Sequence, residues 1–133
     1  TRALRLAMKD AGVNEDEVGY INFHGTSTVM NDRIETMAVK QAFNGHAMKV
    51  PVSSTKSMVG HPQGASGALG VMVSMLTLQE GVLTPTINLE TPDPECDLDY
   101  IANVSREKSI DVAISNCISF GSKNSAMVLR KFS

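Results

Sequence analysis

The sequence predicts a layered α/β fold, in which helices pack on a mixed β-sheet whose last two strands are antiparallel. Helical and strand spacings alternate along the chain in the order helix, strand, helix, strand, helix and strand pair. Residues 121–124 join the final pair, and a link this short is typical of a hairpin. No repeat or composition change divides the 133 residues, so we expect one domain, residues 1–133.

Short patterns predict the first helix and the first two strands. Leu4, Met8 and Ala11 recur at helical spacing, and Gly12 follows as the expected stop of that helix. Residues 18–23 are rich in strand-forming residues, and residues 50–54 predict a second strand.

A second helix is predicted between these strands. The apolar residues that define its face are Ile34, Met37, Ala38 and Ala42. Asp32, with Glu35 three residues later, resembles a capping box, so we expect the helix to start there and to end near Gly45.

The rest of the chain adds a third helix, a loop and the final strands. Residues 60–67 are mostly small, and residues 68–78 are apolar nearly all the way round, which predicts a helix buried on every side. Residues 84–99 combine three prolines with several acids and predict a loop. Residues 110–114 alternate at strand spacing, and residues 125–132 predict the last strand.

Composition is that of a globular protein and excludes two classes of partner. Apolar residues make up 42% and charged residues 20% of the chain, which favours a packed core over disorder. A net charge of −2 and an aromatic content of 5% argue against binding to nucleic acid or to an anionic membrane. Without a signal-peptide pattern or a membrane-length apolar run, we expect a cytoplasmic protein.

The cysteines and the first residue bear on compartment and length. Cys96 and Cys117 show no spacing motif, so a disulfide stays open, although two reduced thiols are the simpler interpretation. The chain does not begin with Met, and its first residues already follow a helical pattern. We therefore expect a piece of a longer protein.

Two histidines lie where an α/β sheet places ligands. His24 follows a predicted strand and His61 precedes the third helix, and both are followed by glycine or small hydroxyl residues. By spacing alone, two unrelated structural histidines are the simpler interpretation. His46 lies in a polar stretch and is expected to be solvated, and the three spacings match no common zinc pattern.

Three motifs change that balance. They are NFHGTST at 22–28 with ND..ET after it, SSTKSMVGHPQGASGA at 53–68 and SNCISFG at 115–121. In this order they resemble the β-ketoacyl synthases of fatty acid and polyketide synthesis, over nearly the whole chain. The resemblance implies the C-terminal half of a thiolase-like fold, without the N-terminal half that carries the nucleophilic cysteine.

The resemblance also implies a reaction, the decarboxylative Claisen condensation of a malonyl thioester with a cysteine-bound acyl group. His24 and His61 match the two histidines whose N–H groups stabilise the thioester oxygen as carbon dioxide leaves. Lys56 matches the active-site lysine, and Glu35 matches its ionic partner. From the helix pattern alone, Glu35 is equally an acid at a helix N-terminus.

Substrate contacts are implied in the same way. Thr26 and Thr28 match residues that hydrogen-bond the phosphopantetheine arm, although loop hydroxyls commonly bond local backbone instead. Phe120 matches a gating phenylalanine, and a core position at a strand end is the alternative.

The implied partners are an acyl carrier protein and malonyl and acyl thioesters. The complete enzyme is expected to be a homodimer and to need no cofactor of its own, because phosphopantetheine arrives on the carrier.

Some positions depart from the family pattern. Asn22, Ser115 and Asn116 match three ligands of a structural cation that some members hold, but Gly70 stands at the position of the glutamate. These residues would mark a vestigial cation site. Cys117 replaces a usual serine and is expected to be a small packing residue.

Two other functions stay open from the sequence. The chain as given, without a nucleophile, is expected to be inactive alone and to act as a dimerisation or carrier-docking module. A thiolase-type acyltransferase shares the fold and condenses without decarboxylation. In either case, half of a two-half core should expose an apolar face and self-associate.

Overall fold

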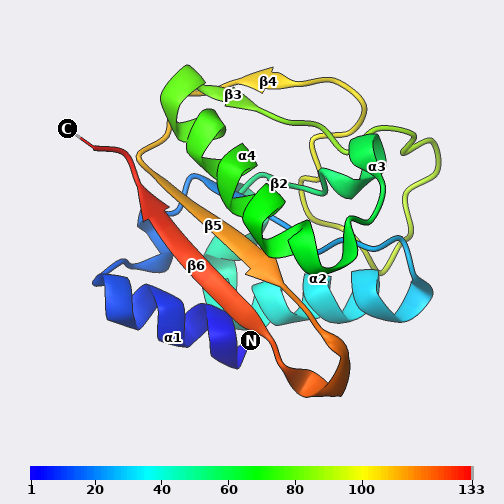
Figure 1. Ribbon diagram of the computed structural model, residues 1–133, viewed down its shortest axis with the longest axis horizontal. Coiled ribbons are helices and arrows are strands. Elements are labelled where there is room, and N and C mark those ends of the chain that lie inside the picture. The colour runs from blue at the N-terminus through cyan, green and yellow to red at the C-terminus, as the bar shows by residue number, and fades with distance from the viewer. Residues whose placement is uncertain (133) are drawn as a thin grey trace.

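A four-stranded mixed sheet forms the centre of the computed structural model, which describes residues 1–132 apart from the side chain of Ser122 (Figure 1). Its strands are β1 (Tyr20–Asn22), β2 (Val52–Ser53), β5 (Val112–Cys117) and β6 (Ser125–Arg130), in the order β2-β1-β5-β6. β1 runs parallel to β2 and β5, whereas β5 and β6 are antiparallel. The predicted mixed sheet and its final antiparallel pair are confirmed.

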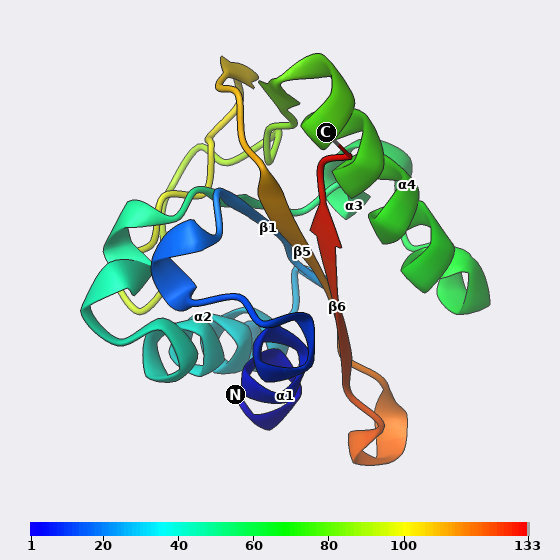
Figure 2. The same cartoon turned by 90° about the vertical axis from the view of Figure 1, so that its left-hand side faces the viewer.

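Helices cover both faces of this sheet, as the edge-on view shows (Figure 2). One face carries α1 (Arg2–Ala11) and α2 (Val29–Phe43), and the other carries α4 (Ser66–Glu80). The short helix α3 (Lys56–Val59) lies between β2 and α4 in the chain, and the small sheet of β3 (Val82–Leu83) and β4 (Arg106–Glu107) follows α4.

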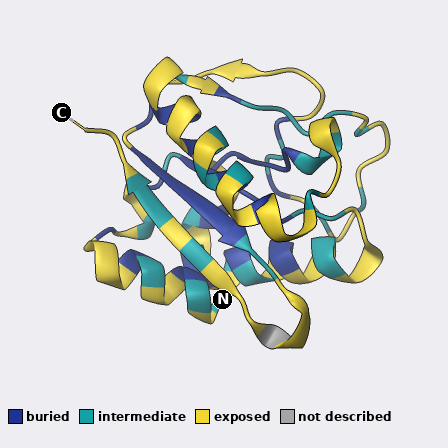
Figure 3. Cartoon of the chain, in the orientation of Figure 1, coloured by how far each residue is buried: buried dark blue, intermediate teal, exposed yellow. Residues whose placement is uncertain are grey.

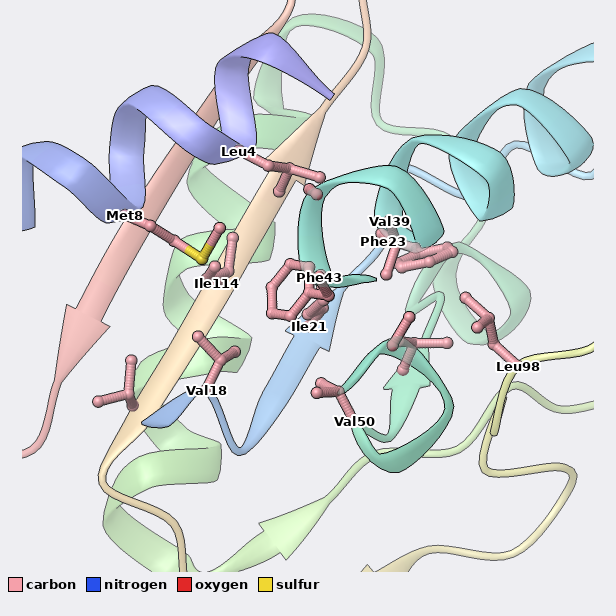
Figure 4. Close-up of a cluster of buried hydrophobic side chains, with 14 of the residues drawn as sticks. Leu4, Met8, Val18, Ile21, Phe23, Val39, Phe43, Val50, Leu98 and Ile114 are labelled. Carbon is pink, nitrogen blue, oxygen red and sulfur yellow. The ribbon is translucent and has the colours of Figure 1, made fainter. Parts of the chain in front are cut away.

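The larger core lies between α1, α2 and the sheet (Figure 4). Leu4 and Met8 of α1 and Val39 and Phe43 of α2 lie there in one cluster with Ile114 of the inner strand β5. α1 follows its predicted pattern, and Gly12 closes it at φ 61°, a left-handed conformation that glycine adopts without strain.

Helix α2 differs from its predicted start and face. Its N-cap is Thr28, whose hydroxyl accepts from the Asn31 N–H at 3.3 Å, and Asp32 lies inside the first turn. The predicted cap at Asp32 is therefore wrong. The face is also displaced, because α2 buries Glu35 beside its apolar core residues while Ile34 remains 45% exposed.

Helix α4 has an inner face of small and polar residues and an outer face of large apolar ones. Ser66, Gly70, Ser74 and Thr77 face the sheet. Met72, Met75 and Leu76 are each more than half exposed. Much of the outward surface of α4 is accordingly yellow, the colour of exposed residues, in Figure 3. The prediction of burial on every side is wrong for this chain, because nothing within residues 1–132 covers the outer face.

This outer face should make the isolated chain self-associate. We expect Met72→Lys with Met75→Lys to shift its sedimentation toward monomer, because charge disfavours burial of that surface between copies. Leu6→Lys is the matched control, since Leu6 is 53% exposed on α1. A monomeric parent chain, or an equal effect of the control, would contradict the prediction.

No helix within residues 1–132 is both long and apolar enough to cross a bilayer. Cys96 and Cys117, both of which the structure describes, are not joined by a disulfide.

Candidate functional site

A cavity of about 580 Å³ opens beside the ends of β1 and β2. The loops that follow these two parallel strands line one wall, which is where α/β sheets bind ligands. Gly25, Thr26, Thr28, Lys56 and His61 supply that wall. The opposite wall comes from the loop after β3, which is held to α2 by ion pairs of Arg33 with Asp93 and Glu95.

Both predicted histidines meet at this end of the sheet. His24 lies two residues beyond β1 and is buried, while His61 lies on the exposed loop between α3 and α4. Their ring centroids are 5.4 Å apart, and the rings are nearly perpendicular at 82°. Residues far apart in the sequence therefore form one pair.

Hydrogen bonds fix which ring nitrogen carries the proton. His61 Nδ1 accepts from the Gln63 N–H at 3.0 Å and lies 3.1 Å from the Ser66 hydroxyl, so its proton lies on Nε2. His24 Nδ1 lies 3.5 Å from the Lys56 ammonium, which can only donate. Both histidines thus present an Nε2–H donor.

Lys56 and Glu35 hold the backbone of His24 from opposite ends. Lys56 Nζ donates to the His24 carbonyl at 2.5 Å, and Glu35 Oε1 accepts from the His24 N–H at 2.7 Å. Among the described residues, these two charged groups do not form the direct ion pair that the family resemblance implied. Hydrogen bonds connect them through the backbone of His24.

Glu35 is fully buried and accepts four N–H donors. Besides His24, they are Gly25 N–H at 2.8 Å, the Asn116 amide at 2.6 Å and the Asn31 amide at 3.3 Å. Burial raises the pKa of Glu35, and these donors oppose the rise. The carboxylate ties the end of β1 to β5 and to the first turn of α2.

Burial, then the Lys56 charge and then His61 lower the pKa of His24 to about 4. Burial also lowers the pKa of Lys56, although the Glu35 carboxylate and Cys117 raise it. His24 is therefore neutral throughout the physiological pH range. Its ring can donate a hydrogen bond from Nε2 as a neutral imidazole.

A pH titration should show this state directly. Because the folded pKa lies below the ordinary value near 6.5, unfolding takes up a proton between these pH values. The contribution of His24 to the free energy of unfolding is therefore fully present above about pH 6.5 and falls as the pH drops toward 4. We expect the His24 ring in an NMR titration to stay neutral at pH 5.5, and a midpoint near 6.5 would contradict this.

Two of the three residues predicted to contact the substrate line the cavity, and the third does not. Thr26 and Thr28 line the cavity, and their hydroxyls lie 3.2 Å apart. Thr28 also caps α2, so the local backbone role is present as well. Phe120 is completely exposed near the tip of the β5–β6 hairpin and does not line the cavity.

Sequence reasoning missed several groups that support the site. Ser66 holds His61, while Asn31 and Asn116 hold Glu35. Cys117, expected to be a packing residue, has Sγ 3.9 Å from His24 Nδ1. Strand alternation after Ser115 could have indicated that Asn116 and Ser115 face opposite sides of the sheet.

The side chains of the three residues that match a cation site do not all face the same side of the sheet. Asn22 and Ser115 are partners in the β1–β5 register, but Asn116 projects to the other face and donates to Glu35. Gly70 approaches the first two so closely that an added Cβ would lie 2.5 Å from Ser115 Oγ. Within residues 1–132, no cluster of three or more His, Cys, Asp or Glu side chains could hold a metal ion.

Comparison with known proteins gives consistent likenesses. The family model for the C-terminal domain of β-ketoacyl synthases matches residues 1–90. The chain is 49% identical to 3-oxoacyl-[acyl-carrier-protein] synthase 2 of Synechocystis sp. over 99% of its own length and 32% of that relative's. It thus spans about a third of the curated relatives it matches.

Solved structures show the same arrangement of elements. The ishigamide ketosynthase/chain length factor aligns with a TM-score of 0.95 and 34% identity, over 99% of this chain and 32% of that one. A type II polyketide ketosynthase, AntDE, solved with its acyl-carrier protein AntF, aligns with a TM-score of 0.93 and 37% identity, over the same shares. These likenesses confirm the predicted fold class.

Proposed function

We propose a catalytic role for this chain, which belongs to the β-ketoacyl synthase family as a C-terminal domain with a thiolase-like fold. It supplies the groups that stabilise negative charge during a decarboxylative Claisen condensation. The observation that carries this proposal is the pair of histidines, 5.4 Å apart, with both Nδ1 atoms engaged. Two Nε2–H groups can then donate to one oxygen.

The proposed reaction begins with the bond between the malonyl carboxylate and the α-carbon. As this bond breaks, carbon dioxide leaves. The electron pair of the broken bond stays with the α-carbon and forms an enolate, which carries negative charge on the thioester oxygen. His24 and His61 donate hydrogen bonds to that oxygen. The enolate carbon then attacks the acyl thioester on a cysteine supplied from outside these residues, and the thiolate leaves as the new carbon–carbon bond forms.

Lys56 and Glu35 position His24 for this role. One binds its carbonyl and the other its N–H, so two charge-assisted hydrogen bonds fix the backbone from which the ring projects. The Lys56 ammonium beside Nδ1 also opposes protonation of the ring, which keeps His24 neutral. The positive charge of Lys56 thus lies beside the His24 ring while the ring itself stays neutral.

The cavity suits the arm of an acyl carrier protein. Thr26 and Thr28 offer hydroxyls along its wall, and His61 lies in the same wall. A related ketosynthase is solved with its acyl-carrier protein, which supports a carrier as the partner. We also propose malonyl and acyl thioesters as substrates, no cofactor beyond the carrier's phosphopantetheine, and a cytoplasmic homodimer for the complete enzyme.

The test is carbon–carbon bond formation by the full-length protein. The protein is incubated with an acyl thioester and a malonyl-loaded carrier protein, and the intact mass of the carrier is measured by mass spectrometry. We expect a β-ketoacyl carrier. Carrier binding without any product would favour the alternative of a non-catalytic docking module.

A further inference from the structure

We infer that helix α4 packs on the sheet by direct contact at Gly70, and that this protein needs no structural cation between them. The resemblance implies that some family members hold a cation there with an asparagine, a glutamate and a Ser-Asn pair. The residues at the matching positions here form a contact of a different kind.

Space is the first argument. Asn22 and Ser115 lie side by side in neighbouring strands and face α4, and Gly70 is the buried helix residue above them. A Cβ on Gly70 would lie 2.5 Å from Ser115 Oγ and 3.3 Å from Asn22 Oδ1. The first separation is shorter than any normal contact, so the helix backbone itself fills the gap.

Charge is the second argument. Gly70 stands at the position of the only acidic ligand, and the inner face of α4 is neutral, with Ser66, Ser74 and Thr77. Asn116 cannot make up the set through its side chain, because it projects to the opposite face and donates to Glu35. Hard cations are bound by several oxygen ligands that normally include carboxylates.

Protein groups bond several of the polar atoms beneath α4, although among the described residues the buried Thr77 hydroxyl has no hydrogen-bond partner. The Ser74 hydroxyl donates to the Gly70 carbonyl at 2.8 Å, and the Asn22 amide donates to the Tyr20 hydroxyl at 3.2 Å. That hydroxyl lies 2.7 Å from Ser53 Oγ and 3.1 Å from Thr84 Oγ1. The Asn22 amide and three hydroxyls beneath the helix are thus bonded to one another.

A mutant cycle in the full-length protein tests the contact. We expect Gly70→Ala to lower the thermal midpoint because its Cβ meets Ser115 Oγ. Ser115→Ala in the same chain should recover most of the loss, since the Ser115 Cβ is an acceptable 3.8 Å away. Gly67→Ala on the same helix is the control, because a Cβ there meets nothing within 4 Å. If Gly70→Ala is tolerated as well as Gly67→Ala, or Ser115→Ala gives no recovery, the direct contact is refuted.

Metal content and salt dependence test the absence of the cation. The purified protein is assayed by elemental analysis, and its midpoint is measured in sodium, potassium, magnesium and tetramethylammonium chlorides at equal ionic strength, with and without chelator. We expect no stoichiometric metal and coincident midpoints. A rise specific to one metal ion, with one equivalent bound, would overturn the inference.

Discussion

Replacing His24 or His61 by alanine in the full-length protein is expected to lower the rate of malonyl decarboxylation by about 10²–10³, with little change in fold. Loss of one oxyanion donor typically costs roughly 2.7–4 kcal/mol of barrier. The two rings are neighbours and both carry their proton on Nε2, so each variant removes one of the two donors proposed for the thioester oxygen. The measurement is release of labelled carbon dioxide from a malonyl carrier protein, at saturating substrate.

His46→Ala is the matched control, because His46 lies on the 3₁₀ helix Asn44–Lys49 and takes no part in the His24–His61 pair. We expect it to keep the parent rate. Near-normal rates in both active-site variants would show that the assigned roles are wrong, whereas unfolding of a variant would appear in its circular dichroism and is checked first.

Replacing Glu35 by alanine should produce a large loss of stability, of roughly 3–5 kcal/mol. Each buried donor left without a partner costs about 1–3 kcal/mol, and Glu35 accepts four. The total falls short of the sum because removing the carboxylate also removes its own burial penalty. Chemical denaturation of the full-length protein measures the free energy of unfolding.

Glu90→Ala is the control for this variant, since Glu90 is exposed in the loop after β3. Its effect should lie within about 0.5 kcal/mol of zero. Glu35→Gln keeps the shape of the side chain but turns an N–H₂ group toward other donors. We therefore expect its loss of stability to lie between those of Glu90→Ala and Glu35→Ala. A change of under 1 kcal/mol in Glu35→Ala would mean that water replaces the carboxylate readily.

The sequence predicted the order of elements because local patterns determined them. α1 has a regular apolar face and a glycine at its end, and β5 and β6 are joined by a short link. The face of α2 could not be found in this way. Its buried surface includes Glu35, which no apolar pattern marks and which only the donors of β1 and β5 make tolerable.

Helix α4 shows a second limit of sequence patterns. Its apolar character all round predicted burial on every side, but the described residues cover only the inner, small and polar face. Spacing cannot indicate whether a partner surface lies in the same segment.

The site was predicted in part. His24, His61, Lys56 and Glu35 were named from motifs, and the structure brings all four together. Their connections were not predictable, because Lys56 and Glu35 meet at the backbone of His24 and motif letters carry no information on backbone partners. Phe120 was named in the same way and lies away from the cavity.

The ratio of carbon dioxide released to carbon–carbon bonds formed, measured with the full-length protein, tests the central claim most directly. Malonyl and acetyl thioesters are offered in parallel as the donor to the same acyl acceptor. The proposed function predicts one carbon dioxide per β-ketoacyl product from malonyl and no product from acetyl. Condensation of acetyl without carbon dioxide would contradict it and identify a thiolase-type acyltransferase instead.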